Sequence, residues 1–556
     1  MNILDIERFF NIFRLYKKTQ QNIMRHLLTV IFITTLSFHF FSQNKSILEF
    51  KKSVYKMEEV MTYIDRMYVD SVDMNDITES AIISMLEKLD PHSVYISKED
   101  VDAANQQIDG SFFGVGIRFQ ILKDTLMVVS TISGGPSEKV GVVAGDKIIL
   151  IDNEKVAGVG LKNFQVREKL MGPKDTKVKI EVMRKNNSKN LEFTITRDKI
   201  PVNSVDSYYM INDKIGYIKL NSFSRSTVEE VHNALSSLKE KGMKDLIFDL
   251  QGNGGGLLYA AQKVADEFLS GNKLIVYSEG KFQPRSDLKA GLNGLWEKGR
   301  LVVLTDEYSA SASEIVSGAV QDWDRGLIVG RRTFGKGLVQ RPIELSDGSQ
   351  IRLTIARYYT PSGRFIQKPY DNINDYKNDL SQRYLNGEFL HADSIHLVDS
   401  LKRSTLKSKR TVYNGGGIMP DIFVPLDTNG ISEYFKLVVQ GGHVNRFSLT
   451  YTNKNRDLLK KEYVNFKQFK SNFICDDKFM NEFFDYIKTE QEDLKFDEKG
   501  YKESEALLKL QLKSLIAQNL FGTNEFYELY NDTNEALQKA IEVLNDNSYN
   551  NMKVDK

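Results

Sequence analysis

Cysteine is nearly absent from this sequence, which has one, Cys475, and histidine is scarce, with seven in 556 residues. A single cysteine excludes an intrachain disulfide, a cysteine-rich zinc site and an iron–sulfur cluster. No two histidines have the HExxH or HxH spacing of a histidine-built metal centre. The chain also lacks an excess of one charge, with 75 Lys and Arg against 74 Asp and Glu, which argues against nucleic-acid binding. The sequence therefore predicts neither a metal nor a cofactor.

Long apolar runs are equally rare, and Leu27–Phe41 is the only one. At about fifteen residues it is short for a membrane-spanning helix, which needs ~20, but suits the apolar part of a signal peptide, and basic residues precede it. Met24 is an alternative start, and the bulky Phe40 makes a poor cleavage site. We expect residues 1–44 to be an export signal or an uncleaved membrane anchor. The mature protein would then be periplasmic, or anchored and facing the periplasm.

The remaining chain changes pattern several times, as expected for three or four domains. Helical periodicity gives way to short β-branched strands with glycine turns, and then to apolar strands that alternate with helices. We predict a multi-domain α+β protein. Its predicted parts after the export segment are a helical region at 45–107, a small β domain at 108–200, an α/β core at 201–428 with a polar insertion at 370–410, and a helical region at 429–556.

Three serines, Ser309, Ser311 and Ser313, lie between the apolar strand LVVLTD and a helical run. A serine at such a junction lies near the free N–H groups of a helix start, which favour developing negative charge. That placement suits a nucleophile. Serine is also a preferred helix N-cap, so capping explains the stretch equally well, and the residues alone do not select one serine.

A nucleophilic serine needs a base, and no histidine lies in a glycine-framed or strand-end motif. A desolvated lysine is the other option, because burial among apolar groups lowers its pKa. Lys336 lies between two glycines, with Gln340 nearby to orient it. An ordinary exposed lysine in a glycine turn is the alternative. The S-x-x-K pattern, as at Ser236/Lys239 and Ser286/Lys289, is expected by chance in a lysine-rich chain and lacks its KTG and SDN companions.

A glycine-rich turn, Asp249–Gly256, follows another apolar strand. Successive free N–H groups in such a turn make an anion nest, which here suits an oxyanion hole. A phosphate loop is the weaker alternative, because the G-x-x-x-x-G-K-[ST] and G-x-G-x-x-G patterns are both absent.

Taken in order, these motifs resemble the C-terminal processing peptidases, or tail-specific proteases, which are serine endopeptidases with a Ser–Lys dyad and a PDZ domain. The resemblance covers roughly residues 50–430. The stretches that carry it are LDPHS (89–93), the segment 110–198, IGYIKLNSF (215–223), DLQGNGGG (249–256), SASASEI (309–315), TFGKGLVQ (333–340), YYTPSGRFIQ (358–367) and GIMPDIFVP (417–425).

The resemblance implies a set of roles in acyl transfer. It makes Ser311 the nucleophile, Lys336 the general base and Gln340 the residue that orients the lysine. It places the oxyanion hole at the amide of Ala312 and at a glycine of the turn, Gly254 or Gly255. Two departures are visible, because the family often has Arg and Pro where this chain has Gln251 and Gly254. A glycine there is expected to loosen the turn.

The resemblance also implies that 108–200 is a PDZ-like domain that selects the substrate. Its carboxylate-binding loop would be Gly114, Val115, Gly116 and Ile117, whose amides capture a free C-terminus while the peptide adds to the sheet edge. A plain hairpin turn is the alternative for these glycines. The expected partners are the C-termini of proteins or peptides. Homo-oligomers, an adaptor protein and membrane association through the N-terminal segment are left open.

Three functions fit the residues to different degrees. The first is an exported Ser–Lys endopeptidase that cleaves proteins near their C-termini. The second is a catalytically inactive PDZ scaffold that binds C-terminal tails, although such a protein would be expected to lose Ser311 or Lys336. The third, a ligand carrier, gives no reason for a glycine-framed lysine beside a nested serine. We therefore expect the endopeptidase.

Overall fold

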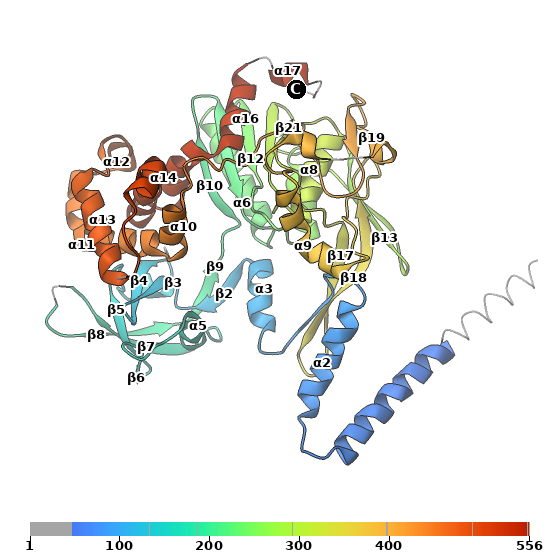
Figure 1. The fold of residues 1–556 in the computed structure, drawn as a ribbon, viewed down its shortest axis with the longest axis horizontal. Helices are drawn as coiled ribbons and strands as arrows, with labels where there is room; N and C mark the ends of the chain where they lie inside the picture. The colour runs from blue at the N-terminus through green and yellow to red at the C-terminus, as the bar shows by residue number, and fades with distance from the viewer. Residues whose placement is uncertain are drawn as a thin grey trace, which may run out of the picture. The chain divides into compact units, whose positions relative to one another are not determined.

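The computed structural model describes residues 47–554, apart from 133, 186, 292, 396–397, 492, 547 and 553. The predicted export segment at 1–44 lies outside the described residues. Within the described ranges, no helix is both long and apolar enough to cross a membrane. The chain divides into two compact units, Met1–Met85 and Leu86–Lys556. The described residues of the first unit include a helix over 47–67 and the larger part of α2 (Met74–Glu87) (Figure 1).

The second unit contains a small β domain after α3 (Val101–Asp109), with two short helices, α4 (Pro136–Lys139) and α5 (Asn163–Leu170). Its sheet has β3 at one edge, and β2 pairs separately with β9. The sheet strands in spatial order are β3 (Ile117–Leu122), β4 (Thr125–Thr131), β5 (Lys147–Ile151), β7 (Lys177–Met183) and β8 (Leu191–Thr196). The short strand β6 (Glu154–Lys155) pairs with β5, and the separate pair is β2 (Ser111–Gly114) and β9 (Asp198–Pro201).

A six-stranded sheet forms the centre of the α/β core. The strands, in order, are β10 (Val205–Met210), β11 (Ile215–Leu220), β12 (Asp245–Asp249), β15 (Arg300–Thr305), β16 (Leu327–Gly330) and β21 (Ile422–Phe423). All neighbouring pairs are parallel except β10 with β11. The strands β11, β12 and β16 are buried along their whole length, which explains why they appear in the sequence as continuous apolar runs.

Different segments cover the two faces of this sheet. Helices α6 (Thr227–Glu240), α7 (Leu258–Asp266) and α8 (Ala312–Asp322) pack on the face that carries Ile218 and Phe248. The opposite face, which carries Tyr217 and Ile247, packs against α16 (Glu535–Asn545) near the C-terminal end of the chain (Figure 1). Alternate residues of one strand therefore enter two separate cores.

The protein also has a second sheet, in which all the strand pairs are antiparallel. It consists of β1 (Val94–Ile96), β18 (Gln350–Tyr359), β13 (Leu274–Gly280) and β14 (Gln283–Lys289), with β17 (Leu338–Glu344) also paired to β18. The apolar stretch KLIVYS therefore belongs to this sheet and not to the parallel one. Because β1 follows LDPHS directly, its pairing with β18 brings that motif into the core.

The insertion contains α9 (Ile373–Leu385), η1 (Ala392–Ser394), η2 (Asp399–Leu401) and a short pair, β19 (Lys402–Ser404) with β20 (Thr411–Tyr413). Beyond it, an aromatic-rich cluster holds together α10 (Glu433–Gln440), α11 (His443–Glu462), α12 (Phe466–Asn472), α13 (Asp477–Glu490) and α14 (Glu498–Leu520). The last elements are α15 (Thr523–Tyr530), η3 (Asn531–Thr533), α16 and α17 (Ser548–Asn551). The predicted multi-domain α+β class is confirmed.

Candidate active site

Ser311 lies at the junction between β15 and α8 in a backbone conformation that is rare for a side chain other than glycine, with φ 54° and ψ −109°. The residues before it are held by Asp306, whose carboxylate accepts from the amides of Tyr308 and Ser309, each at 3.0 Å. Strain of this kind persists only where the surroundings fix it, and it is found mainly at functional sites.

The carboxylate of Glu314 joins the Ser311 loop to the Lys336 loop. It is fully buried and accepts from the amides of Ser311 at 2.8 Å and Lys336 at 2.8 Å. Gly335 N at 2.7 Å and Thr333 Oγ1 at 2.6 Å complete its hydrogen bonds. Burial raises the pKa of Glu314 to about 7, and these hydrogen bonds oppose the rise. Glu314 had no predicted role, although its spacing from Ser311 matches the S-x-x-E capping box.

Tyr358, on β18, makes a second link between the same two loops. Its hydroxyl donates to the carbonyl of Lys336 at 2.6 Å and lies 3.1 Å from the carbonyl of Ser311. The side chain is buried, and burial raises its pKa well above the ordinary value, so the hydroxyl stays a donor. Tyr358 was part of a motif in the sequence, but nothing there indicated this contact.

Lys336 is largely buried, and this burial lowers the pKa of its amino group. Its Nζ donates to Gln340 Oε1 at 3.0 Å, as predicted for an orienting residue. Gln340 in turn donates from Nε2 to the carbonyl of His92, and His92 Nε2 lies 2.6 Å from the hydroxyl of Tyr376 on α9. Among the described residues, no hydrogen bond joins Ser311 Oγ directly to Lys336 Nζ. Catalytic hydrogen bonds are often long in the absence of substrate and form only when substrate binds.

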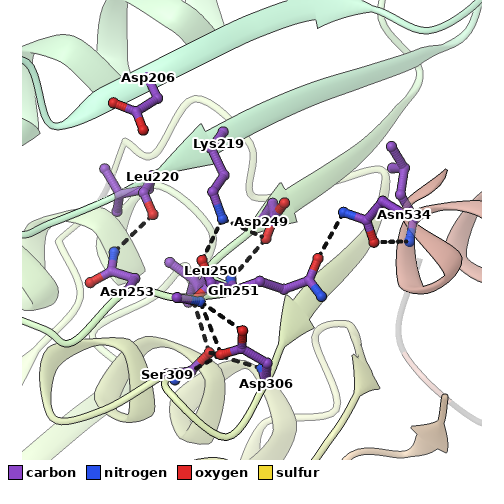
Figure 2. Close-up of polar contacts among 12 residues, drawn as sticks. Asp206, Lys219, Leu220, Asp249, Leu250, Gln251, Asn253, Asp306, Ser309 and Asn534 are labelled. Carbon is purple, nitrogen blue, oxygen red and sulfur yellow. Dashed lines mark hydrogen bonds and ion pairs between the residues drawn. The ribbon is translucent and has the colours of Figure 1, made fainter. Parts of the chain in front are cut away.

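The turn after β12 is closed by the bond from Asn253 N to the carbonyl of Leu250 at 3.1 Å, with Gly252 at φ 71°. This left-handed position requires glycine. The amide of Gly252 donates to both oxygens of Asp306 at 2.9 Å, and Asn253 Nδ2 bonds a strand carbonyl (Figure 2). The glycine-rich turn is therefore held at Gly252 and Asn253, and the looseness expected from Gly254 stays a prediction.

Gly255 is the glycine of this turn that lies against the proposed nucleophile. A Cβ placed on it would come within 2.8 Å of Ser311 Cβ and 3.0 Å of Ala312 N, whereas a Cβ on Gly254 would meet nothing within 4 Å. The amide of Gly255 donates to Asn253 Oδ1 at 2.9 Å. Among the described residues, no acceptor is bonded to the amides of Gly254 and Ala312.

The loop at 114–117 connects β2 to β3, which belong to different sheets. It is therefore not the turn of a hairpin. Two of its carbonyls accept hydrogen bonds from backbone amides. The Val115 carbonyl accepts from Ser137 N at 3.0 Å, and the Gly116 carbonyl accepts from Ile132 N at 2.9 Å. Within the described part of the chain, the amides of Val115 and Gly116 bond no acceptor. Edge strand β3 follows directly, starting at Ile117.

The predicted site residues thus form two groups. Ser311, Ala312, Lys336, Gln340 and the glycine turn come together in the α/β core, whereas 114–117 lies in the small β domain. Across the described ranges, no group of three or more His, Cys, Asp or Glu side chains is placed to hold a metal ion.

Comparisons with known proteins cover most of the chain. The model of peptidase family S41 matches residues 214–375, and a PDZ domain model matches 114–195. The N-terminal domain of the activating protease CtpB matches 35–100. Residues 434–522 match a family of unknown function.

Individual relatives agree with these models. The carboxy-terminal-processing protease of Bartonella bacilliformis is 33% identical over 394 residues, which are 70% of this chain and 88% of the relative. The carboxy-terminal processing protease CtpA of Bacillus subtilis is 34% identical over 354 residues, 62% of this chain and 74% of the relative. The solved photosystem II D1 C-terminal processing protease is 28% identical, with 67% of this chain and 86% of that chain covered, and its TM-score of 0.36 adds no support. The predicted family and enzyme class are confirmed. The chain belongs to peptidase family S41, as a serine-type carboxy-terminal processing protease with a PDZ domain.

Proposed function

We propose that this protease acts outside the cytoplasm and cleaves proteins near their C-termini through an acyl-enzyme on Ser311, with Lys336 as the general base. The observation that carries the mechanism is the shared carboxylate of Glu314, which fixes the amides of Ser311 and Lys336 to one point. Desolvation of Lys336 favours the neutral amine that a base must present, and Gln340 holds that amine in place.

Three steps follow from this arrangement. Lys336 takes the proton of the Ser311 hydroxyl as the oxygen attacks the peptide carbonyl. The amides of Ala312 and Gly255 hold the resulting oxyanion, and the Gly255 amide exchanges its bond to Asn253 Oδ1 for this one. Gly255 is chosen over Gly254 because it lies against Ser311 and because the family often has proline, which has no amide donor, at position 254. The protonated lysine then gives its proton to the leaving amine, and water releases the acyl group.

The PDZ domain binds the peptide C-termini of substrates. We assign this binding to Gly114, Val115, Gly116 and Ile117, because the free amides of Val115 and Gly116 are donors for a terminal carboxylate. In the part of the chain that the structure describes, no strand pairs with the outer edge of β3, which leaves that edge for a peptide strand beyond the loop. The export proposal depends on the sequence alone, on the apolar run Leu27–Phe41 and its basic flank.

The decisive experiment measures cleavage of a protein substrate with an apolar free C-terminus. Ser311→Ala and Lys336→Ala are each expected to lower kcat by at least about a thousandfold. The exposed pair Ser286 and Lys289 forms a chance S-x-x-K match, so Ser286→Ala and Lys289→Ala are matched controls that should keep full activity. Amidation of the substrate C-terminus should weaken its binding.

Other outcomes would contradict the proposal. Turnover that survives in Ser311→Ala or Lys336→Ala would show that Ser311 and Lys336 are not the catalytic dyad. A wild-type protein that binds the tail peptide but cleaves nothing would instead be the inactive PDZ scaffold.

A further inference from the structure

A hydrogen bond connects the glycine turn of the active site to the C-terminal segment 523–554. Asn534 is the N-cap of α16, where its Oδ1 accepts from Leu537 N at 3.1 Å. The cap leaves Nδ2 free to donate to Gln251 Oε1, at 2.9 Å (Figure 2). Both side chains are half-buried. Because the cap fixes the position of Asn534, the bond also fixes the side chain of Gln251.

The main chain of Gln251 is held from the strand side. Its amide donates to Asp249 Oδ1 at 2.8 Å, and its carbonyl accepts from Lys219 Nζ. Lys219 and Asp249 are buried, and Lys219 Nζ lies 3.2 Å from Asp249 Oδ1. The hydroxyl of Tyr217 donates to Asp249 Oδ2 at 2.6 Å. Residue 251 is therefore the point at which a buried polar cluster and the C-terminal segment meet.

Among the residues that the structure describes, the other hydrogen bonds of the turn come from the protease core. Gly252 bonds Asp306, and Asn253 Nδ2 donates to the carbonyl of Leu220 at 2.9 Å. These partners lie inside the S41 match at 214–375. Among the hydrogen bonds of the described residues, the one to Asn534 is the only one that joins this turn directly to the chain beyond 522.

The C-terminal segment is itself anchored to the sheet. Asn524 Oδ1 accepts from the amide of Tyr208 at 2.8 Å, and Asn531 Nδ2 donates to the hydroxyl of Tyr209 at 2.8 Å. With α16 packed on the sheet, the segment is a fixed support and not a passing contact.

We propose that Asn534 is a positioning residue for the oxyanion turn: through Gln251, the C-terminal segment sets where Gly255 lies relative to Ser311. This inference depends on the proposed function, since it assumes that Gly255 holds the oxyanion. It also accounts for glutamine where the family often has arginine. An arginine side chain has no acceptor for Asn534 Nδ2, whereas the neutral amide of Gln251 accepts that bond.

The test compares two substitutions at one position. Asn534→Ser keeps a good N-cap but is too short to reach Gln251, and it should lower kcat about three- to tenfold with KM and PDZ peptide affinity unchanged. Asn534→Asp caps the helix and can accept from a reoriented Gln251 amide, so it should keep wild-type kcat. Asn465→Ser makes the same change at the N-cap of α12 and should also leave kcat unaltered.

A second variant tests the other partner, in case Asn534→Ser does not fold. Gln251→Ala should lower kcat as Asn534→Ser does, and the double variant should lower it no further. The inference would be overturned if Asn534→Ser or Gln251→Ala kept wild-type kcat, or if their losses of kcat added in the double variant. It would also be overturned if Asn465→Ser or Asn534→Asp lost as much kcat as Asn534→Ser. Turnover that persists in Ser311→Ala would refute the proposed function instead, so the two failures are seen in different variants.

Discussion

The carboxylate of Glu314 lies between the loops that carry Ser311 and Lys336. By accepting from the amides of both residues, it fixes their main chains relative to each other. Removing it would leave buried amides without acceptors, which costs roughly 1–3 kcal/mol for each group. Local geometry at this site is therefore set by a residue that performs none of the proposed chemistry.

Neighbouring glycines of the turn should respond in opposite ways to a side chain. Gly255→Ala places a methyl group against Ala310 O and Ser311 Cβ, each 2.8 Å away, at φ 102°. We expect kcat/KM to fall by at least about a hundredfold, the scale of losing an oxyanion donor. Gly254 is not left-handed and its Cβ position is open, so Gly254→Pro should keep activity within about threefold.

Peptidase assays on the two purified variants check this pair, with circular dichroism as the folding control. A folded Gly254→Pro protein without activity would show that the amide of Gly254 holds the oxyanion, and the assignment to Gly255 would be wrong.

Sequence motifs predicted Ser311, Lys336 and Gln340 as site residues, because the family pattern gives their order and spacing. They were not sufficient for the contacts that hold these residues. Tyr358 and the carbonyl of His92 come from strands and turns far away in the chain, and their contacts depend on how two sheets pack. Glu314 is the intermediate case, since a local capping pattern marks it.

Helix α9 gives the polar insertion a structural role that the sequence did not indicate. Its Tyr376 bonds His92 at 2.6 Å, and the ammonium of Lys368 lies over the rings of Phe334 and Tyr376, at 3.9 and 4.3 Å from their centroids. Because the carbonyl of His92 holds Gln340, α9 supports the lysine side of the site.

The burial of His92 should make the core sensitive to acid. Burial, and then the nearby charge of Lys336, lower the pKa of His92 to about 4, with Lys368 adding to the fall and Asp90 opposing it. A folded-state pKa below the unfolded value of about 6.5 means that neutral His92 stabilises the fold above pH 6.5. That stability, up to roughly 3 kcal/mol, should be lost as the pH falls from about 6.5 to 4.

Urea unfolding followed by tryptophan fluorescence measures this effect, since both tryptophans, Trp296 and Trp323, lie in the α/β core. Between pH 7 and pH 4, His92→Gln should lose less unfolding free energy than the wild type. His232→Gln, at a half-exposed histidine, is the control and should follow the wild type. Parallel losses in all three proteins would contradict the prediction.

Most elements of the core were evident from apolar runs, and IGYIKL became β11 with the same bounds. The sheet to which a strand belongs was less evident. KLIVYS has the same composition as its neighbours, yet β13 pairs with β18 because long-range packing, and not its own residues, selects its partner.

At the scale of the whole molecule, a reporter enzyme can test the proposed export. Residues 1–46 fused to a phosphatase that is active only outside the cytoplasm should give active enzyme. Val30→Arg with Ile33→Arg should abolish that activity, because charges in the apolar run Leu27–Phe41 oppose insertion. Ile6→Arg, outside the run, is the matched control and should have no effect.

An inactive wild-type fusion would contradict export through this segment. Equal activity with and without the two arginines would show that the apolar run is not the signal.

The C-terminal region was expected to be helical, but its division into two parts was not. Helices α10–α14 share an aromatic core of their own, whereas α16 belongs to the core of the protease sheet. Helical periodicity shows that a face is apolar without showing which surface it will cover.

Helix α16 also joins the protease sheet late in the synthesis of the chain. A chain is made from its N-terminus onward, so β11, β12, β15 and β16 exist long before the helix that covers their second face. The proposed tie between Asn534 and the glycine turn is made equally late. A chain that has grown only as far as residue 430 therefore has these strands, but neither the helix that covers their second face nor the bond from Asn534 to Gln251.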